Sequence, residues 1–210
     1  MLLNQEVVTL DGWELFLRHH AGTHSAEAAD SEGVSLGDDP FQDLTDAQLR
    51  LRPHGLNSIA WLIWHIARCE DVVVNVLLAD RPQVFDDGDW ARRINAFRRD
   101  IGTGMTNEEV SELSAGVDIP SLRVYRVVVG KRTQAAIRSL QALKWDDVIE
   151  TARVREAVSQ GALGPNAGWM EGPWATKTKA WFFDWEVVGH NYFHLGQAMW
   201  VRKLVATNSP

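Results

Sequence analysis

Two histidines four residues apart are the clearest candidates for chemistry in this sequence. His190 and His194 lie in the proline-free stretch WFFDWEVVGHNYFHLGQAMWVRKL, residues 181–204. In an α-helix, residues four apart stand one turn apart on the same face, so both imidazoles point in one direction. Two imidazole nitrogens on one face can bind the same divalent metal ion. Because packing alone also produces such pairs, the spacing leaves a metal site and a merely buried pair open.

A third histidine stands in the second strongly helical stretch, residues 58–78. His65 shares an apolar arc with neighbours such as Trp61 and Val72, so we expect it to point into the core. A buried histidine satisfied by one hydrogen bond is one interpretation, and a metal ligand is the other. Cys69, one turn further on, is either an additional ligand or a small buried apolar residue.

Three charged residues, Arg68, Glu70 and Asp71, follow His65 within six positions and are predicted to have different places relative to the site. Arg68 falls at the edge of the same helix face, where its guanidinium would hold an anionic group at the rim of the site. Glu70 and Asp71 are expected to project away from it.

Two polar residues flank the histidine pair at one-turn spacing. Glu186 precedes His190 and is predicted to be a hydrogen-bond partner of an imidazole, a general base or a fourth ligand, in that order. Gln197 follows His194 and is a candidate partner for a ligand or for bound water.

The helix that carries the pair is apolar on two sides. One predicted stripe consists of Trp181, Trp185, Val188, Tyr192, Leu195 and Met199. The histidines share the opposite side with Phe183, Val187 and Val201. A helix that is apolar all round is buried, so the histidines should face an interior or a pocket.

Four long helical segments and no convincing strand predict an all-α fold, a four-helix bundle with long connecting loops. The segments are residues 4–20, 58–78, 120–143 and 181–204. Ser58 or Asn57 is a suitable cap for the second, and a capping box at Thr106 opens a further short helix.

The remaining clusters have ordinary explanations. His19, His20 and His24 stand at the end of the first helix, where the helix dipole favours histidine, so a metal role is the minor alternative. Residues 27–46 carry seven acids and no base and are expected to form a solvated loop.

Residues 121–144 carry six bases and no acid, which indicates a solvated face or, alternatively, a surface that steers an anionic cosubstrate. The Gly-, Pro- and Trp-rich residues 161–174 are predicted to form a lid or pocket wall.

Composition limits the classes of protein. The chain has 210 residues, 45% hydrophobic and 23% charged, which fits one domain over 1–210. A net charge of −7 argues against nucleic acid as a partner, and no apolar run predicts a membrane span. The single cysteine, Cys69, suits the reducing cytoplasm.

The stretches SIAWLIWHIARCED, with His65, and GHNYFHLGQ, with His190 and His194, resemble the DinB-like or YfiT-like metalloprotein superfamily. The resemblance implies an up-down-down-up four-helix bundle in which these three histidines bind one divalent metal, with zinc first and nickel or manganese as alternatives. Leu195 stands where the family commonly has arginine.

Similar proteins include enzymes that use low-molecular-weight thiols, such as mycothiol-dependent maleylpyruvate isomerase and bacillithiol S-transferases. The resemblance therefore implies a metal-dependent transferase or isomerase that activates a thiol cosubstrate toward a small-molecule substrate. The alternatives are a non-catalytic bundle that binds metal or a small ligand, and a structural bundle with buried histidines. The apolar stripe from Trp181 to Met199 needs cover, which either the other helices of the bundle or a second subunit would supply, and the hypothesis is a homodimer.

Overall fold

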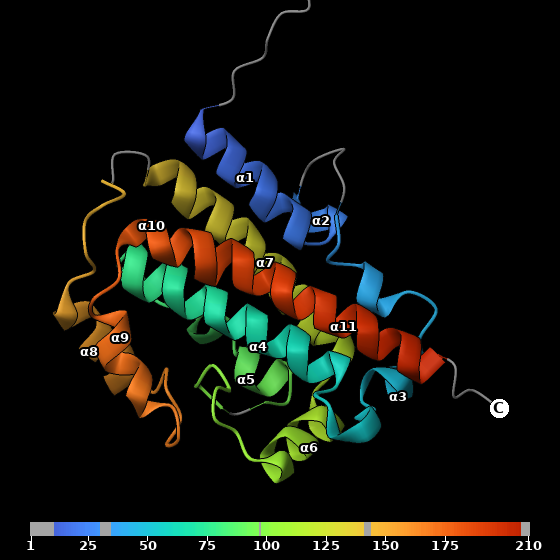
Figure 1. Ribbon diagram of the computed structural model, residues 1–210. Helices are drawn as coiled ribbons and strands as arrows, with labels where there is room; N and C mark the ends of the chain where they lie inside the picture. Colours follow the sequence, from blue (N-terminus) through green and yellow to red (C-terminus); the bar gives the residue numbers. More distant parts are fainter. Residues whose placement is uncertain (1–10, 30–34, 97, 141–143, 207–210) are drawn as a thin grey trace, which may run out of the picture.

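Four long helical segments form a bundle (Figure 1) in the computed structural model, which describes residues 11–29, 35–96, 98–140 and 144–206. The first three are α1 (Gly12–Thr23), α4 (Ile59–Asp71) continued by η3 (Val72–Leu78), and α7 (Ile119–Ser139). The fourth consists of three consecutive elements, α10 (Lys179–Trp181), η6 (Phe182–Gly189) and α11 (His190–Ala206). The first and last segments run one way and α4 and α7 the other. This confirms the predicted up-down-down-up bundle.

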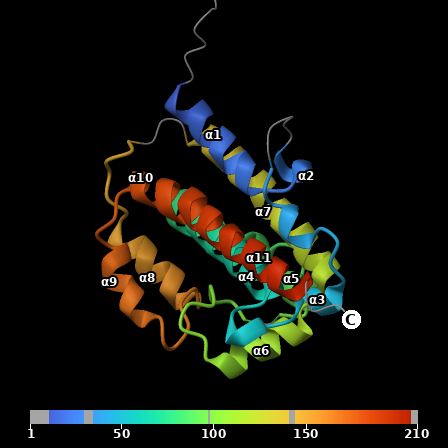
Figure 2. The ribbon, with the colours of Figure 1, turned by 45° about the vertical axis from the view of Figure 1, so that its right-hand side comes forward.

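Short helices occupy the connections between the long ones. They are α2 (Ala26–Ala29), η1 (Asp39–Phe41), α3 (Asp46–Leu49), η2 (Pro53–Gly55), η4 (Val84–Asp86), α5 (Trp90–Arg93), α6 (Asn107–Gly116), α8 (Thr151–Ser159), η5 (Gly168–Met170) and α9 (Glu171–Trp174). Figure 2 shows α8 and α9 together beside the bundle. The described residues contain no strand beyond an isolated bridge between Val148 and Thr178. Among these same residues, no helix is long and apolar enough to cross a membrane.

The helix starts follow from local sequence. Ser58 caps α4 by accepting a hydrogen bond from the backbone N–H of Trp61. Thr106 and Glu109 form the expected capping box at α6, and Asp118 caps α7. Residues 4–10 of the first predicted helix and residues 141–143 of the third lie outside the described part of the chain.

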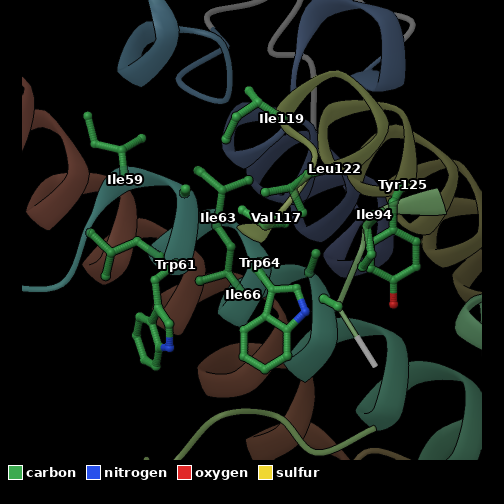
Figure 3. Close-up of a cluster of buried hydrophobic side chains, with 14 of the residues drawn as sticks. Ile59, Trp61, Ile63, Trp64, Ile66, Ile94, Val117, Ile119, Leu122 and Tyr125 are labelled. Carbon is green, nitrogen blue, oxygen red and sulfur yellow. The ribbon is translucent and has the colours of Figure 1, made fainter. Parts of the chain in front are cut away.

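Helix α4 is the central element, because every one of its residues is buried. Its apolar side chains pack against α7 and α11 and against the segment that follows η3, which contributes Ile94 and Val117. Figure 3 shows this cluster, in which Trp64 of α4 and Tyr125 of α7 are among the largest buried side chains. His65 is therefore held on a helix that packing fixes on all sides.

Two segments of the bundle, η3 and η6, are π-helical, whereas the sequence pattern predicted regular α-helix there. Each π-helical hydrogen bond spans one residue more than an α-helical one, so the side chains that follow are rotated about the axis. The stripe predicted for the last helix is consequently wrong in part. Trp185 is 44% exposed, whereas Phe182 and Val187 are fully buried.

The acidic and basic segments meet. Asp38 lies 3.4 Å from the guanidinium of Arg123, and Glu27 lies 3.5 Å from the ammonium of Lys131, both on α7. The acidic segment is also not wholly a loop, because it contains α2 and η1. These exposed pairs favour the ordinary interpretation of the basic residues, a solvated face balanced by nearby acids. Arg126 is an exception, because its side chain is buried.

Candidate metal centre

His65, His190 and His194 come together between α4 and α11. The ring centroid of His65 lies 5.0 Å from that of His190 and 4.8 Å from that of His194. The rings of His190 and His194 are 4.4 Å apart, and their Nε2 atoms are 2.9 Å apart. Three imidazoles on one tetrahedral ion, with metal–nitrogen bonds of about 2.0–2.1 Å, would have ring centres about 5 Å apart. The observed separations fit a shared ion.

All three imidazoles favour their neutral form. Burial and the neighbouring His194 lower the pKa of His65 to about 3. Burial, together with His65 and His194, lowers the pKa of His190 to about 2, and burial also lowers the pKa of His194. A neutral imidazole is the form that binds a metal ion, so the surroundings prepare these side chains as ligands.

Hydrogen bonds at the far side of two rings determine which nitrogen is free. The Nδ1–H of His65 donates to the backbone carbonyl of Ile101, and the Nδ1–H of His194 donates to the Oε1 of Gln197 at 2.7 Å. In both rings Nε2 then carries the lone pair. This arrangement is usual for metal-binding histidines, whose second nitrogen donates to a carbonyl or carboxylate. Gln197 thus has a position that fits the role predicted for it as a hydrogen-bonding partner.

The segment that brings Ile101 to His65 depends on a glycine. Gly102 has a φ of +86°, and a Cβ atom there would lie 2.5 Å from the ring of Trp64. Only glycine combines this backbone conformation with such a close approach to α4. No signal in the sequence pointed to Ile101 as a partner of His65, because the contact is made by a backbone carbonyl.

Cys69 lies beside the site. Its Sγ is 3.8 Å from Nδ1 and 3.9 Å from Nε2 of His65, and Cys69, His65 and His190 form a group whose ligand atoms lie within 4.8 Å of one another. Burial, followed by the charge of Glu186, raises the pKa of the Cys69 thiol well above its ordinary value. Because a metal ligand must be the thiolate, the donor set of three imidazoles suits the site better than one that includes this thiol.

Glu186 is buried near the site, with 6% of its surface exposed. Burial raises its pKa to about 7, although a hydrogen bond with Trp174 acts in the opposite direction. It belongs to η6, whose wider turns offset it from the regular one-turn spacing to His190 that the sequence suggested. A carboxyl group with a pKa near neutrality is able to take up and release a proton, which suits the predicted role of general base.

The structure corrects the predicted place of Arg68. Its side chain is fully buried, not at a rim. The guanidinium donates to Asp71, to the hydroxyl of Tyr125 at 2.8 Å and to the side-chain oxygen of Gln83 at 2.6 Å. It also donates to the carbonyl of Arg99. Through its two terminal nitrogens, Arg68 connects α4 to α7 and to the segment that follows η3.

The neighbouring acids are also buried, contrary to the expectation that they project away. Asp71 accepts hydrogen bonds from Tyr125, at 2.6 Å, and from the backbone N–H groups of Val84 and Phe85. Glu70 contacts His20 and His24 of the N-terminal region, and these three form a second group with converging ligand atoms. The sequence signal was the four-residue spacing of His20 and His24, the same one as in the last helix.

The fold and this site define a four-helix bundle with a three-histidine centre between its second and fourth long helices. The model of the DinB superfamily matches residues 39–198, and the chain belongs to that superfamily. A comparison with curated proteins gave no match. Among solved structures, the crystal structure of the conserved protein of locus from Enterococcus faecalis matches with a TM-score of 0.66 at 18% identity. The match covers 95% of this chain and 100% of that one, and at this identity it shows likeness of fold alone.

Proposed function

We propose that this protein is a metal-dependent enzyme that activates a low-molecular-weight thiol. The thiol is either transferred to a small-molecule substrate or used as a cosubstrate in the isomerisation of that substrate. The observation that carries the proposal is the convergence of His65, His190 and His194 with two of their Nδ1 atoms held by acceptors. Zinc is the first expectation for three neutral imidazoles, with nickel or manganese as alternatives. When bound, the ion would lower the pKa of a coordinated thiol and supply a thiolate near neutral pH.

The residues around the histidines have distinct tasks in this proposal. Gln197 holds the ring of His194, and the carbonyl of Ile101 holds that of His65. Glu186, with its pKa near 7, is the group proposed to accept the thiol proton, which then passes to solvent when a halide leaves or to the product when the substrate is isomerised. Arg68 has no contact with substrate in this scheme, because its side chain is fully buried and both terminal nitrogens are already engaged.

Metal content is the first test. The protein should be purified without a metal-affinity column and its metal measured by elemental analysis, beside His194→Ala and the control His19→Ala. His19 lies on an exposed part of α1 and is not in the centre. We expect the ion of the three-histidine centre to be lost in His194→Ala and retained in His19→Ala. No ion in any of the three proteins, with no uptake on titration, would overturn the proposal.

Thiol binding is the second test. In the cobalt form, a thiolate bound to the ion gives a sulfur-to-metal charge-transfer band in the near ultraviolet, which 2-mercaptoethanol should produce. Turnover of that thiol with a chromogenic aryl halide would then be measured for the native protein and for Glu186→Gln. Metal without a thiolate band or turnover would instead indicate a non-catalytic metal-binding protein.

We also propose that the protein forms a homodimer. The last helical segment exposes several aromatic side chains, with Trp185 at 44%, Phe193 at 55% and Trp200 at 68%. Exposed aromatic groups on one helix are typical of surfaces that contact another protein. Light scattering at micromolar concentration should give twice the chain mass, and a monomer would contradict this proposal.

A further inference from the structure

We propose that His20, His24 and Glu70 form a second site for a divalent transition-metal ion, separate from the three-histidine centre. His20 and His24 come from the end of α1 and the residue that follows it, and Glu70 comes from α4. All three side chains are fully buried. Two imidazoles and one carboxylate are a donor set that zinc and its neighbours accept, whereas calcium and magnesium require more oxygen atoms.

The ligand atoms converge on one side of the Glu70 carboxylate. Its Oε1 lies 2.9 Å from Nε2 of His20 and 3.1 Å from Nε2 of His24, which is also 3.0 Å from Oε2. Two ligand atoms that bind the same tetrahedral ion, each at about 2.1 Å, are about 3.4 Å apart. The three side chains therefore need to separate by only a few tenths of an ångström to admit an ion.

The other carboxylate oxygen is fixed from outside. Oε2 of Glu70 accepts hydrogen bonds from Asn191, at 3.0 Å, and from Arg126, at 3.3 Å. Arg126 is itself anchored by the carbonyl of Thr23 and by Oδ1 of Asn191, each at 3.1 Å. Such outer partners orient a metal-binding carboxylate. Oε1 faces both imidazoles, and Oε2 also contacts Nε2 of His24.

The two imidazoles can change which nitrogen carries the proton. Without an ion, each Nε2–H donates to the Glu70 carboxylate. Their Nδ1 atoms are buried and have no hydrogen-bond partner among the described residues, so no contact there opposes a move of the proton to Nδ1. Moving the proton to Nδ1 leaves the Nε2 lone pair for the metal. The ring of His24 also fills space that exists only because residue 130 is glycine, where a Cβ atom would lie 2.4 Å from its Nδ1.

Charge determines the order of filling. Arg126 is the cation closest to the Glu70 carboxylate, and it would share that carboxylate with the ion. The mutual repulsion of two buried cations weakens binding. We therefore expect the three-histidine centre to fill first and the second site only in metal excess.

Metal stoichiometry tests the proposal. Chelator-treated full-length protein is dialysed against excess zinc, and bound metal is counted by elemental analysis. We expect about two ions per chain in the native protein and in His19→Ala, and about one in His194→Ala and in His20→Ala. The doubly substituted protein, with both His20→Ala and His194→Ala, should bind none.

A conservative variant guards against misfolding. Glu70→Gln keeps a carbonyl oxygen that accepts hydrogen bonds but removes the carboxylate charge, and it should retain the helical circular dichroism while losing the second ion. One ion in the native protein at saturation, lost in His194→Ala and unaffected by His20→Ala, would overturn this inference and leave the proposed function intact. One ion in the native protein at saturation, lost in His20→Ala and unaffected by His194→Ala, would instead support this inference and overturn the proposed function.

Discussion

The Nδ1 atom of His194 lies 2.7 Å from Oε1 of Gln197, less than one helical turn further along α11. Removing an outer partner of a metal-binding histidine typically costs about 10- to 100-fold in metal affinity. We therefore expect Gln197→Leu to weaken zinc binding by about that factor. Competition against a chromophoric chelator measures it.

The control for this experiment is the adjacent Gly196→Ala. Gly196 is exposed, and nothing lies within 4 Å of the position that its Cβ would take. Replacing a glycine inside a helix by alanine raises the free energy of unfolding by about 0.5–1 kcal/mol. Gly196→Ala should keep the native zinc affinity, and equal losses in both variants would argue that Gln197 does not orient His194.

Gly102 is not a metal ligand, but it is expected to affect zinc binding because it positions the Ile101 carbonyl beside His65. In Gly102→Ala, the new methyl group would meet Trp64 and the backbone would be strained at its φ of +86°. The loop should move away from α4, so the Ile101 carbonyl would no longer fix the ring of His65. We expect both a lower urea midpoint and weaker zinc binding, and a variant with unchanged zinc affinity would show that the Ile101 contact is dispensable.

Glu186 should make the stability of the metal-free protein depend on pH. Its pKa is raised from 4.5 to about 7 in the folded state, mainly by burial, so the folded protein holds this proton more tightly than the unfolded chain. This contribution is fully present below pH 4.5 and is lost as the pH rises through 7. A shift of this size corresponds to about 3 kcal/mol in the free energy of unfolding.

Urea unfolding of chelator-treated protein between pH 5 and about 8 tests this expectation. Glu186→Gln stays neutral throughout, so its stability should fall less than that of the native protein as the pH rises. Parallel profiles for the two proteins would show that Glu186 titrates at its ordinary pKa.

Arg68 is predicted to support the fold and to take no direct part in chemistry. Arg68→Met would leave the buried carboxylate of Asp71 without its cation, and breaking a buried pair costs about 3–5 kcal/mol. The free energy of unfolding should fall by that amount, while zinc stoichiometry in the folded fraction stays native. A stable Arg68→Met variant with impaired thiol turnover would instead support the role first predicted for Arg68, which is to hold an anionic group of the substrate.

The local sequence determined the helices and much of the three-histidine centre. The caps at Ser58 and Thr106 are local patterns, and the four-residue spacing of His190 and His194 requires only a helix to bring both rings to one face. The apolar surroundings of His65 correctly placed it in the core. These features depend on residues close together in the chain, which is why they could be predicted.

Tertiary packing decided the rest. The π-helical turns of η3 and η6 altered which residues of the last segment are buried, and helix periodicity alone does not encode such turns. Arg68 was expected at the rim of the site and Glu70 was expected to project away from it. Instead, α1 and α7 cover both residues and supply buried partners 46 or more residues away along the chain. The burial of a charged group depends on which distant helices cover it, and only the tertiary structure brings those helices together.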